Sequence, residues 1–195
     1  MKNSFLAMAA AAISFAACNS NNTTSKDKTD KSSDTTQSKV QTNTTAAETK
    51  GTASVNELIS SYLQLKNALT GDNAKEAASA GNTLSETIGK IDKSTFTPDQ
   101  KKVYDEVEAD IKEHGEHIGA NADKIAHQRE HFEMLSKDIY DLVKAFGGGQ
   151  KLYKDYCPMY NEGKGATWIS ETKEIKNPYL GKKMPTCGSV KEEIK

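Results

Sequence analysis

The chain has 195 residues, with 26 Lys and Arg against 27 Asp and Glu, which gives a formal net charge of −1. This balance argues against a strongly basic nucleic-acid-binding protein, because phosphate recognition depends on a basic face, so we expect no nucleic-acid partner. Only 35% of the residues are hydrophobic and the mean hydropathy is −0.71. The length fits one folded domain, and the low apolar content indicates a separate unfolded segment.

Residues 1–17 have the pattern of a secretory signal peptide. An apolar stretch from Phe5 to Phe15 follows a lysine, and two alanines lie immediately before Cys18. The sequence around Cys18 resembles a bacterial lipobox, which implies cleavage before this residue and its lipidation; an ordinary signal peptide is the alternative. We therefore expect a protein of the cell envelope that is anchored by lipid to a membrane, on the periplasmic side or at the cell surface.

Residues 18–50 consist mainly of Asn, Ser, Thr, Lys, Asp and Gln. Such a segment cannot bury enough apolar surface to offset its conformational entropy. We expect a disordered polar tether here, followed by a folded domain over residues 51–195.

Helical periodicity predicts two helices in the first part of this domain. The first begins near the capping-box pair Ser54 and Glu57 and ends at Gly71. Its expected core stripe comprises Val55, Leu58, Ile59, Tyr62, Leu65 and Leu69. The second runs over about residues 74–91 and is rich in small residues, which permit a close approach to a neighbouring helix.

Two further helices are predicted before residue 147. Thr97, Pro98 and Gln100 are typical of a helix N-terminus, with Thr97 as the N-cap. Asn121 is expected to cap the last helix, which continues to about residue 146, where three consecutive glycines end it. Four helices joined by short loops predict an all-α fold, an antiparallel four-helix bundle.

Residues 150–195 show no sustained helical period. They contain Cys157, Cys187, Trp168 and three of the four prolines. We expect an irregular C-terminal arm that packs on the bundle and needs a further constraint, such as a disulfide or a metal ion.

Two sulfur-bearing motifs lie in this arm, at residues 157–159 and 184–187. Thiolates and thioethers are the ligands that soft ions such as Cu(I) and Ag(I) prefer, so the candidate metal ligands are Cys157, Met159, Met184 and Cys187. The alternative is a Cys157–Cys187 disulfide, the usual pairing of two cysteines in an exported chain. In that case the protein would be a structural or interaction lipoprotein with a pinned arm and no metal.

All four histidines lie close together in the sequence, at His114, His117, His127 and His131. The spacings i, i+3 and i, i+4 place each pair on one face of its helix, and two imidazoles at i, i+4 are a common half-site for a transition metal. We take His127 and His131 as candidate ligands beside the core, and His114, His117 and Met134 as weaker ones. A solvated charged face is the alternative, and zinc is a less favoured ion than copper or silver.

Motifs for catalysis are missing from the sequence: no Gly-rich phosphate loop opens a helix, and there is no Gly-x-Ser-x-Gly. We therefore expect a protein that is not an enzyme.

Several short motifs in the second half of the chain resemble a domain-of-unknown-function family, DUF3347, over roughly residues 55–194. They are Gln128–Phe132, Leu135–Ser136, Tyr156–Met159, Gly165–Ser170, Asn177–Tyr179, Gly181–Met184 and Thr186–Gly188. The family occurs in Gram-negative lipoproteins and is appended to some periplasmic adaptor proteins of heavy-metal efflux systems. The resemblance implies metal binding, for buffering or for handover to such an efflux adaptor. On this basis we expect the arm to fold back along the last helix and join the sulfur motifs to the histidines in one soft-metal site.

Overall fold

The computed structural model describes residues 44–195, and side chains from residue 54 onward. The expected signal peptide, Cys18 and most of the expected tether lie outside the described residues. The α-helices are α1 (Thr44–Thr70), α2 (Ala74–Ile88), α3 (Pro98–Ala120) and α4 (Ile125–Phe146). The strands are β1 (Leu152–Cys157), β2 (Ala166–Ser170) and β3 (Ser189–Ile194), and short 3-10 turns lie at Lys93–Thr95 and Gly181–Lys183.

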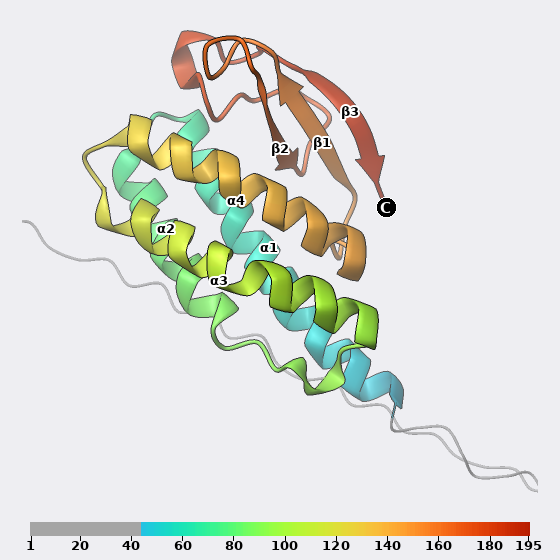
Figure 1. Ribbon diagram of the computed structural model, residues 1–195. Helices are drawn as coiled ribbons and strands as arrows, with labels where there is room; N and C mark the ends of the chain where they lie inside the picture. Colours follow the sequence, from blue (N-terminus) through green and yellow to red (C-terminus); the bar gives the residue numbers. More distant parts are fainter. Residues whose placement is uncertain (1–43) are drawn as a thin grey trace, which may run out of the picture. The chain divides into compact units, whose positions relative to one another are not determined.

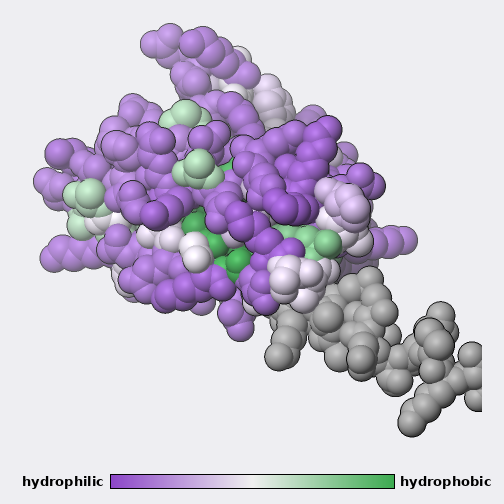
Figure 2. All heavy atoms as spheres, turned by 60° about the horizontal axis from the view of Figure 1, so that its bottom comes forward, coloured by the Kyte–Doolittle hydropathy of each residue, from purple (hydrophilic) through white to green (hydrophobic). Residues whose placement is uncertain are grey.

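The four helices pack side by side around an apolar core (Figure 1). Helix α1 packs against α2 and α4, and α3 packs against the same two helices on the other side. All six residues of the stripe expected for the first helix are buried. Figure 2 shows one face of the molecule, on which hydrophilic residues cover most of the surface and the most hydrophobic ones lie recessed between them. The helical region is therefore consistent with the expected bundle.

Local signals correctly predict the end of α1 at Gly71, the start of α3 and the end of α4, and they misplace the starts of α1 and α4. Thr97 and Gln100 form a reciprocal capping box at the start of α3, and Gly147, with φ of 76°, follows the end of α4. Helix α1 begins at Thr44, so Ser54 lies inside it. Asn121 caps the C-terminus of α3 through a bond from its side-chain amide to the carbonyl of His117 (2.8 Å), and α4 begins only at residue 125.

The predicted all-α fold class is wrong, because the C-terminal arm forms a three-stranded antiparallel sheet of order β2-β1-β3. The strands have five or six residues each, and none alternates between apolar and polar residues throughout. In β1 an irregularity between Lys154 and Asp155 shifts the pairing with β3. A shift of this kind breaks the period-two pattern on which strand prediction depends.

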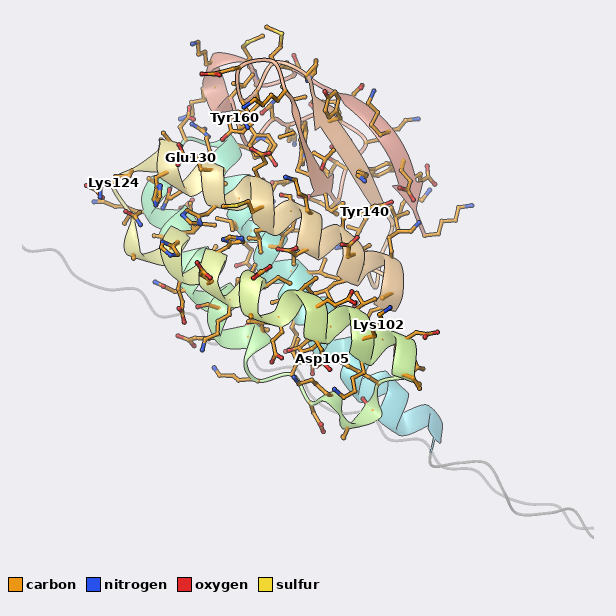
Figure 3. All side chains as sticks on the ribbon, viewed as in Figure 1. Lys102, Asp105, Lys124, Glu130, Tyr140 and Tyr160 are labelled. Atoms are coloured by element: carbon orange, nitrogen blue, oxygen red, sulfur yellow. The ribbon has the colours of Figure 1, made fainter. Side chains whose placement is uncertain are left out.

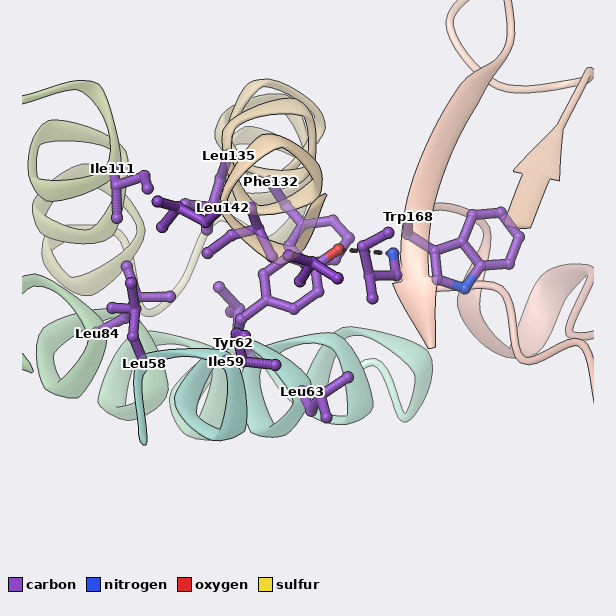
Figure 4. Packing of buried hydrophobic residues seen from close by; sticks show 14 of the residues in the cluster. Leu58, Ile59, Tyr62, Leu63, Leu84, Ile111, Phe132, Leu135, Leu142 and Trp168 are labelled. Carbon is purple, nitrogen blue, oxygen red and sulfur yellow. Dashed lines mark hydrogen bonds between the residues drawn. The ribbon is translucent and has the colours of Figure 1, made fainter. Parts of the chain in front are cut away.

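The sheet packs on α4 and α1 through a buried contact around Tyr62 (Figure 4). The Ser136 hydroxyl donates to the Phe132 carbonyl (2.7 Å), so the Tyr62 hydroxyl, 2.8 Å away, donates to Ser136. The Tyr62 oxygen in turn accepts a hydrogen bond from the amide of Ile169 in β2 (3.1 Å). Trp168, the neighbouring residue, is fully buried. Tyr62 thus joins α1, α4 and the sheet by directional bonds as well as by apolar area.

Ionisable side chains are also buried between α1 and the sheet. Lys66 on α1 is fully buried and pairs with Glu171 at 2.6 Å. Asp155 on β1 is also fully buried, and its carboxyl oxygens have no hydrogen-bond partner among the described residues. Burial raises the pKa of Asp155 to about 7, although the charge of Lys66 acts in the opposite direction. The folded protein therefore favours the neutral form of the Asp155 carboxyl group below about pH 7.

We expect Asp155→Asn to raise the free energy of unfolding at about pH 8 by about 1–3 kcal/mol. In the wild-type protein the carboxyl group has its ordinary pKa of 3.8 when the chain is unfolded and a pKa of about 7 when it is folded. The folded state therefore binds more protons between these values, and wild-type stability falls as the pH rises through this window. Urea unfolding at several pH values measures the difference between the two proteins, which should shrink toward about pH 4.

A matched control is Glu162→Gln, which removes an acid on an exposed turn. Its stability should follow that of the wild type at every pH. If the free energies of unfolding of Asp155→Asn and the wild type changed in parallel with pH, the carboxyl group of Asp155 would have the same pKa in the folded and unfolded protein. That result would contradict the prediction.

Candidate metal centre

The four histidines meet at one end of the α3–α4 helical hairpin. His114 and His117 lie in the last two turns of α3, and His127 and His131 lie in the first two turns of α4. The connection between these helices, residues 121–124, is short, so the two pairs face each other. Figure 3 marks this end of α4 by the labelled residues Lys124 and Glu130.

Three of these histidines form a group suited to a metal ion. The ring nitrogens of His117, His127 and His131 that could act as ligands all lie within 4.8 Å of one another. Within residues 44–195 this is the one such group of three or more His, Cys, Asp or Glu residues. Three protein ligands with solvent access leave a further coordination position open.

His131 lies at the centre of the cluster. Its ring centroid is 4.4 Å from that of His117, 4.6 Å from that of His127 and 5.3 Å from that of His114. Its Nδ1 lies 3.1 Å from Nδ1 of His114. When His131 donates this proton to His114, its Nε2 is left unprotonated and available to a metal ion. His114 is then a positioning residue that fixes the tautomer of His131, as outer-shell partners commonly do.

The nitrogen separations, at most 4.8 Å, can be compared with those of a tetrahedral site. Bonds of about 2.0–2.1 Å would place the ligand nitrogens about 3.3–3.4 Å apart, so the group must contract by no more than about 1.5 Å. His117 is exposed, and His127 and His131 are only partly buried, which leaves their rings free to make these small rotations. The residues present therefore fit a transition-metal ion.

The surroundings of His114 and His131 favour the neutral imidazole, the form that binds metals. Burial lowers the pKa of both His114 and His131, and the neighbouring imidazoles lower that of His131 further. Nδ1 of His127 lies 3.2 Å from a carboxylate oxygen of Glu130, which leaves Nε2 of His127 as its metal-binding atom.

The two cysteines of the arm form a second group. Cys157 is the last residue of β1 and is buried, and Cys187, shortly before β3, is partly exposed. Their sulfur atoms lie 3.2 Å apart, and both are free thiols. The backbone of Met159 makes a hydrogen bond to the Cys187 sulfur, and the carbonyl of Met184 accepts one from the Cys187 amide (3.2 Å). The side chains of both methionines are exposed, as is that of Met134 on α4.

The histidines and the cysteines lie on opposite sides of α4, so the expected joint site does not form. Arg129 and Glu133 of α4 contact Pro178 and Asn161 of the C-terminal segment. At about 100° per residue, Arg129 lies about 180° around the helix from the midpoint of His127 and His131. The sheet thus covers one side of α4, while the histidines of α4 face α3.

His117, a weaker candidate from its sequence spacing, is one of the three closest ligands. The signal that predicts its role is its position relative to the loop: His117 lies four residues before Asn121, and His127 lies three residues after Lys124. Residues at similar distances from the loop of a helical hairpin lie at about the same level of its two helices. Glu130, the partner of His127, is a residue of the site that the sequence motifs do not indicate.

The fold and the site define a small helical bundle with an added three-stranded sheet and a histidine cluster in one helical hairpin. Residues 58–151 match the model of a family described as a protein of unknown function (DUF3347). This part of the chain is therefore similar to that family, which confirms the resemblance found in the sequence over these residues. The match covers all four histidines and ends before β1, so it is shorter than the expected span and does not include the cysteines.

No curated protein and no solved structure matches the chain. Among residues 44–195, none of the helices has the length and apolar character needed to span a bilayer.

Proposed function

We propose that this protein is a metal-binding module without enzymatic activity, in which His117, His127 and His131 are the ligands. The observation that carries the proposal is the convergence of three imidazoles from two helices within 4.8 Å. Two further contacts support it, since His114 and Glu130 are placed to fix the tautomers of His131 and His127.

The proposed ion at the histidines is a divalent transition metal. Imidazole nitrogens suit Zn(II), Cu(II) and Ni(II), and Cu(II) binds most tightly in the general order of these ions. The expected preference for Cu(I) or Ag(I) depends on sulfur ligands. With the sulfur motifs on the other side of α4, we propose that such soft ions bind the reduced Cys157 and Cys187 instead.

We further propose that the protein is held at a membrane of the cell envelope by a lipid on Cys18. The support is the sequence pattern of residues 1–18 and the polar composition of the segment that follows. A metal site tethered in this way could buffer a toxic ion near the membrane or hand it to a periplasmic efflux adaptor. The exposure of His117 suits such a transfer, because an incoming ligand can reach the ion from solvent.

We expect His131→Ala in the full chain to weaken Cu(II) and Zn(II) binding by more than about 100-fold, beyond the 10–100-fold cost of losing an outer-shell partner. His114→Ala, which removes such a partner, should weaken binding by about 10–100-fold. Isothermal titration calorimetry under reducing-agent-free conditions measures both effects. His117→Ala changes an exposed side chain and tests the same site without risk to folding.

The matched control is the double variant Cys157→Ser, Cys187→Ser, which should bind the divalent ions as the wild type does. Equal affinities for the wild type and His117→Ala would contradict the proposed site. If only the double cysteine variant lost its affinity for the divalent ions, the ligands would be the sulfur atoms and not the histidines.

A further inference from the structure

The two cysteines lie at the open end of the β1–β3 ladder. In this ladder Tyr156 pairs with Ser189, so the residues that follow Tyr156 and precede Ser189 lie across from one another. Cys157 follows Tyr156 directly. On the other side of the ladder, Gly188 precedes Ser189, and Cys187 precedes Gly188. The sulfur separation of 3.2 Å is only about 1.2 Å longer than a covalent S–S bond.

Packing around Cys187 fixes this approach independently of any bond between the sulfur atoms. The buried side chain of Asn177 donates a hydrogen bond to the Cys187 carbonyl (2.6 Å). Gly188 has φ of 147°, and a Cβ there would lie 3.0 Å from the carbonyl oxygen of Tyr156 and 2.9 Å from the Trp168 ring. A glycine therefore allows the chain to pass close to β1, and the reduced thiols are held near bonding geometry.

We infer that Cys157 and Cys187 form an intramolecular disulfide by exchange with a low-molecular-weight disulfide. Cys187 is partly exposed, so its thiolate attacks one sulfur of the reagent, forms a mixed disulfide and releases one thiol. The buried Cys157 thiolate then attacks the Cys187 sulfur, forms the internal bond and releases the second thiol. The protein loses two protons and two electrons, and the reagent gains them as two thiols.

This bond would tie the strand at the C-terminal end of the fold to the central strand of its sheet. It would also remove both thiolates as ligands, so the oxidised protein could hold a metal ion only at its other groups. The inference does not depend on the proposed metal site, because no histidine takes part in the exchange.

Treatment of the full chain with oxidised glutathione, followed by non-reducing peptide mapping, tests the inference. We expect a peptide pair joined through Cys157 and Cys187, with a mass lower by two hydrogen atoms than the sum of the reduced peptides. The pair should be absent from Cys187→Ser, in which a partly exposed side chain is replaced by one of similar size. The midpoint of urea unfolding should fall on reduction in the wild type and stay unchanged in this variant.

Three results would overturn the inference: both thiols remain free to alkylation, glutathione stays attached to Cys187, or either cysteine links to Cys18. The wild type and Cys187→Ser both keep the histidine site. Calorimetric titration of the same samples with Cu(II) therefore tests the proposed metal site separately from the disulfide.

Discussion

Gly81→Ala is expected to lower the free energy of unfolding by about 2–3 kcal/mol. A Cβ at Gly81 in α2 would lie 2.8 Å from Cγ2 of Ile118 and 2.9 Å from the carbonyl oxygen of Gly115, both in α3. The reverse contact is equally tight, because a Cβ at Gly115 would lie 2.9 Å from the Gly81 carbonyl oxygen. The two helix backbones touch here, so the helices must separate to admit a methyl group. The higher helix propensity of alanine, about 1 kcal/mol, offsets only part of this cost.

Gly89→Ala is the matched control for this prediction. Gly89 follows α2 with helical dihedral angles, and a Cβ there would meet nothing closer than 3.9 Å. Its stability should equal that of the wild type or exceed it by about 0.4–1 kcal/mol. Urea unfolding followed by circular dichroism measures both variants. If both gave the same stability, the α2–α3 contact would be looser than its geometry indicates.

Arg129→Ala is expected to lower the free energy of unfolding by about 2–4 kcal/mol, because the guanidinium joins three parts of the chain. It donates to the carbonyl of Pro178 (2.7 Å), to the carbonyl of Leu69 near the end of α1 (2.9 Å) and to the carboxylate of Asp72 (2.6 Å). Its removal takes one donor from each of these acceptors and weakens the link between the C-terminal segment and the end of α1, where the Lys182 amide still donates to Asp72 (3.1 Å). Hydrogen exchange should therefore accelerate in residues 177–183 of the variant.

Asp72→Asn separates the ion pair from the other bonds of Arg129. Asp72 has φ of 56°, a conformation that asparagine tolerates well. Its amide oxygen can still accept from Arg129, and we expect a loss below about 1 kcal/mol. Arg129 lowers the pKa of Asp72, so this small contribution should disappear in acid. If Arg129→Ala and Asp72→Asn lowered the free energy of unfolding equally, the whole contribution of Arg129 would come from its ion pair with Asp72.

The helices were predictable because each carries its own signals. The apolar stripe of α1, the capping box at Thr97 and the glycine at position 147 act within one or two turns, so nearby residues determine them. The start of α4 was misplaced because Asn121 satisfies the end of the preceding helix instead. Only the geometry of the loop decides between these two uses of an asparagine.

The sheet could not be read from the sequence in the same way. Its strands are short, β3 carries three charged residues among its six, and the irregularity at Lys154 and Asp155 interrupts the alternation in β1. Pairing with distant strands, and packing on α4, stabilise these segments more than their local pattern does. The sequence of the arm has no regular apolar and polar pattern, and for this reason it predicts irregular structure where the protein forms a sheet.

The candidate site was predictable in part. Helical spacing places His127 and His131 on one face, and the structure adds His117 from the facing helix. The joining of histidines and cysteines was wrong, because the side of α4 that receives the sheet depends on contacts such as that of Arg129 with Pro178. Spacing along one helix cannot specify which neighbour covers each face.

The bonds that α1 makes to β2 and to Glu171, which follows it, have a consequence for the order in which the protein can assemble during synthesis. Tyr62 and Ile169 are 107 residues apart in the chain, and Lys66 and Glu171 are 105 apart. The α2–α3 and α3–α4 hairpins need only neighbouring residues and can form as each helix leaves the ribosome. Helix α1 is made before the other helices, but it cannot bury its lysine and tyrosine against their final partners until β2 and Glu171 have been translated.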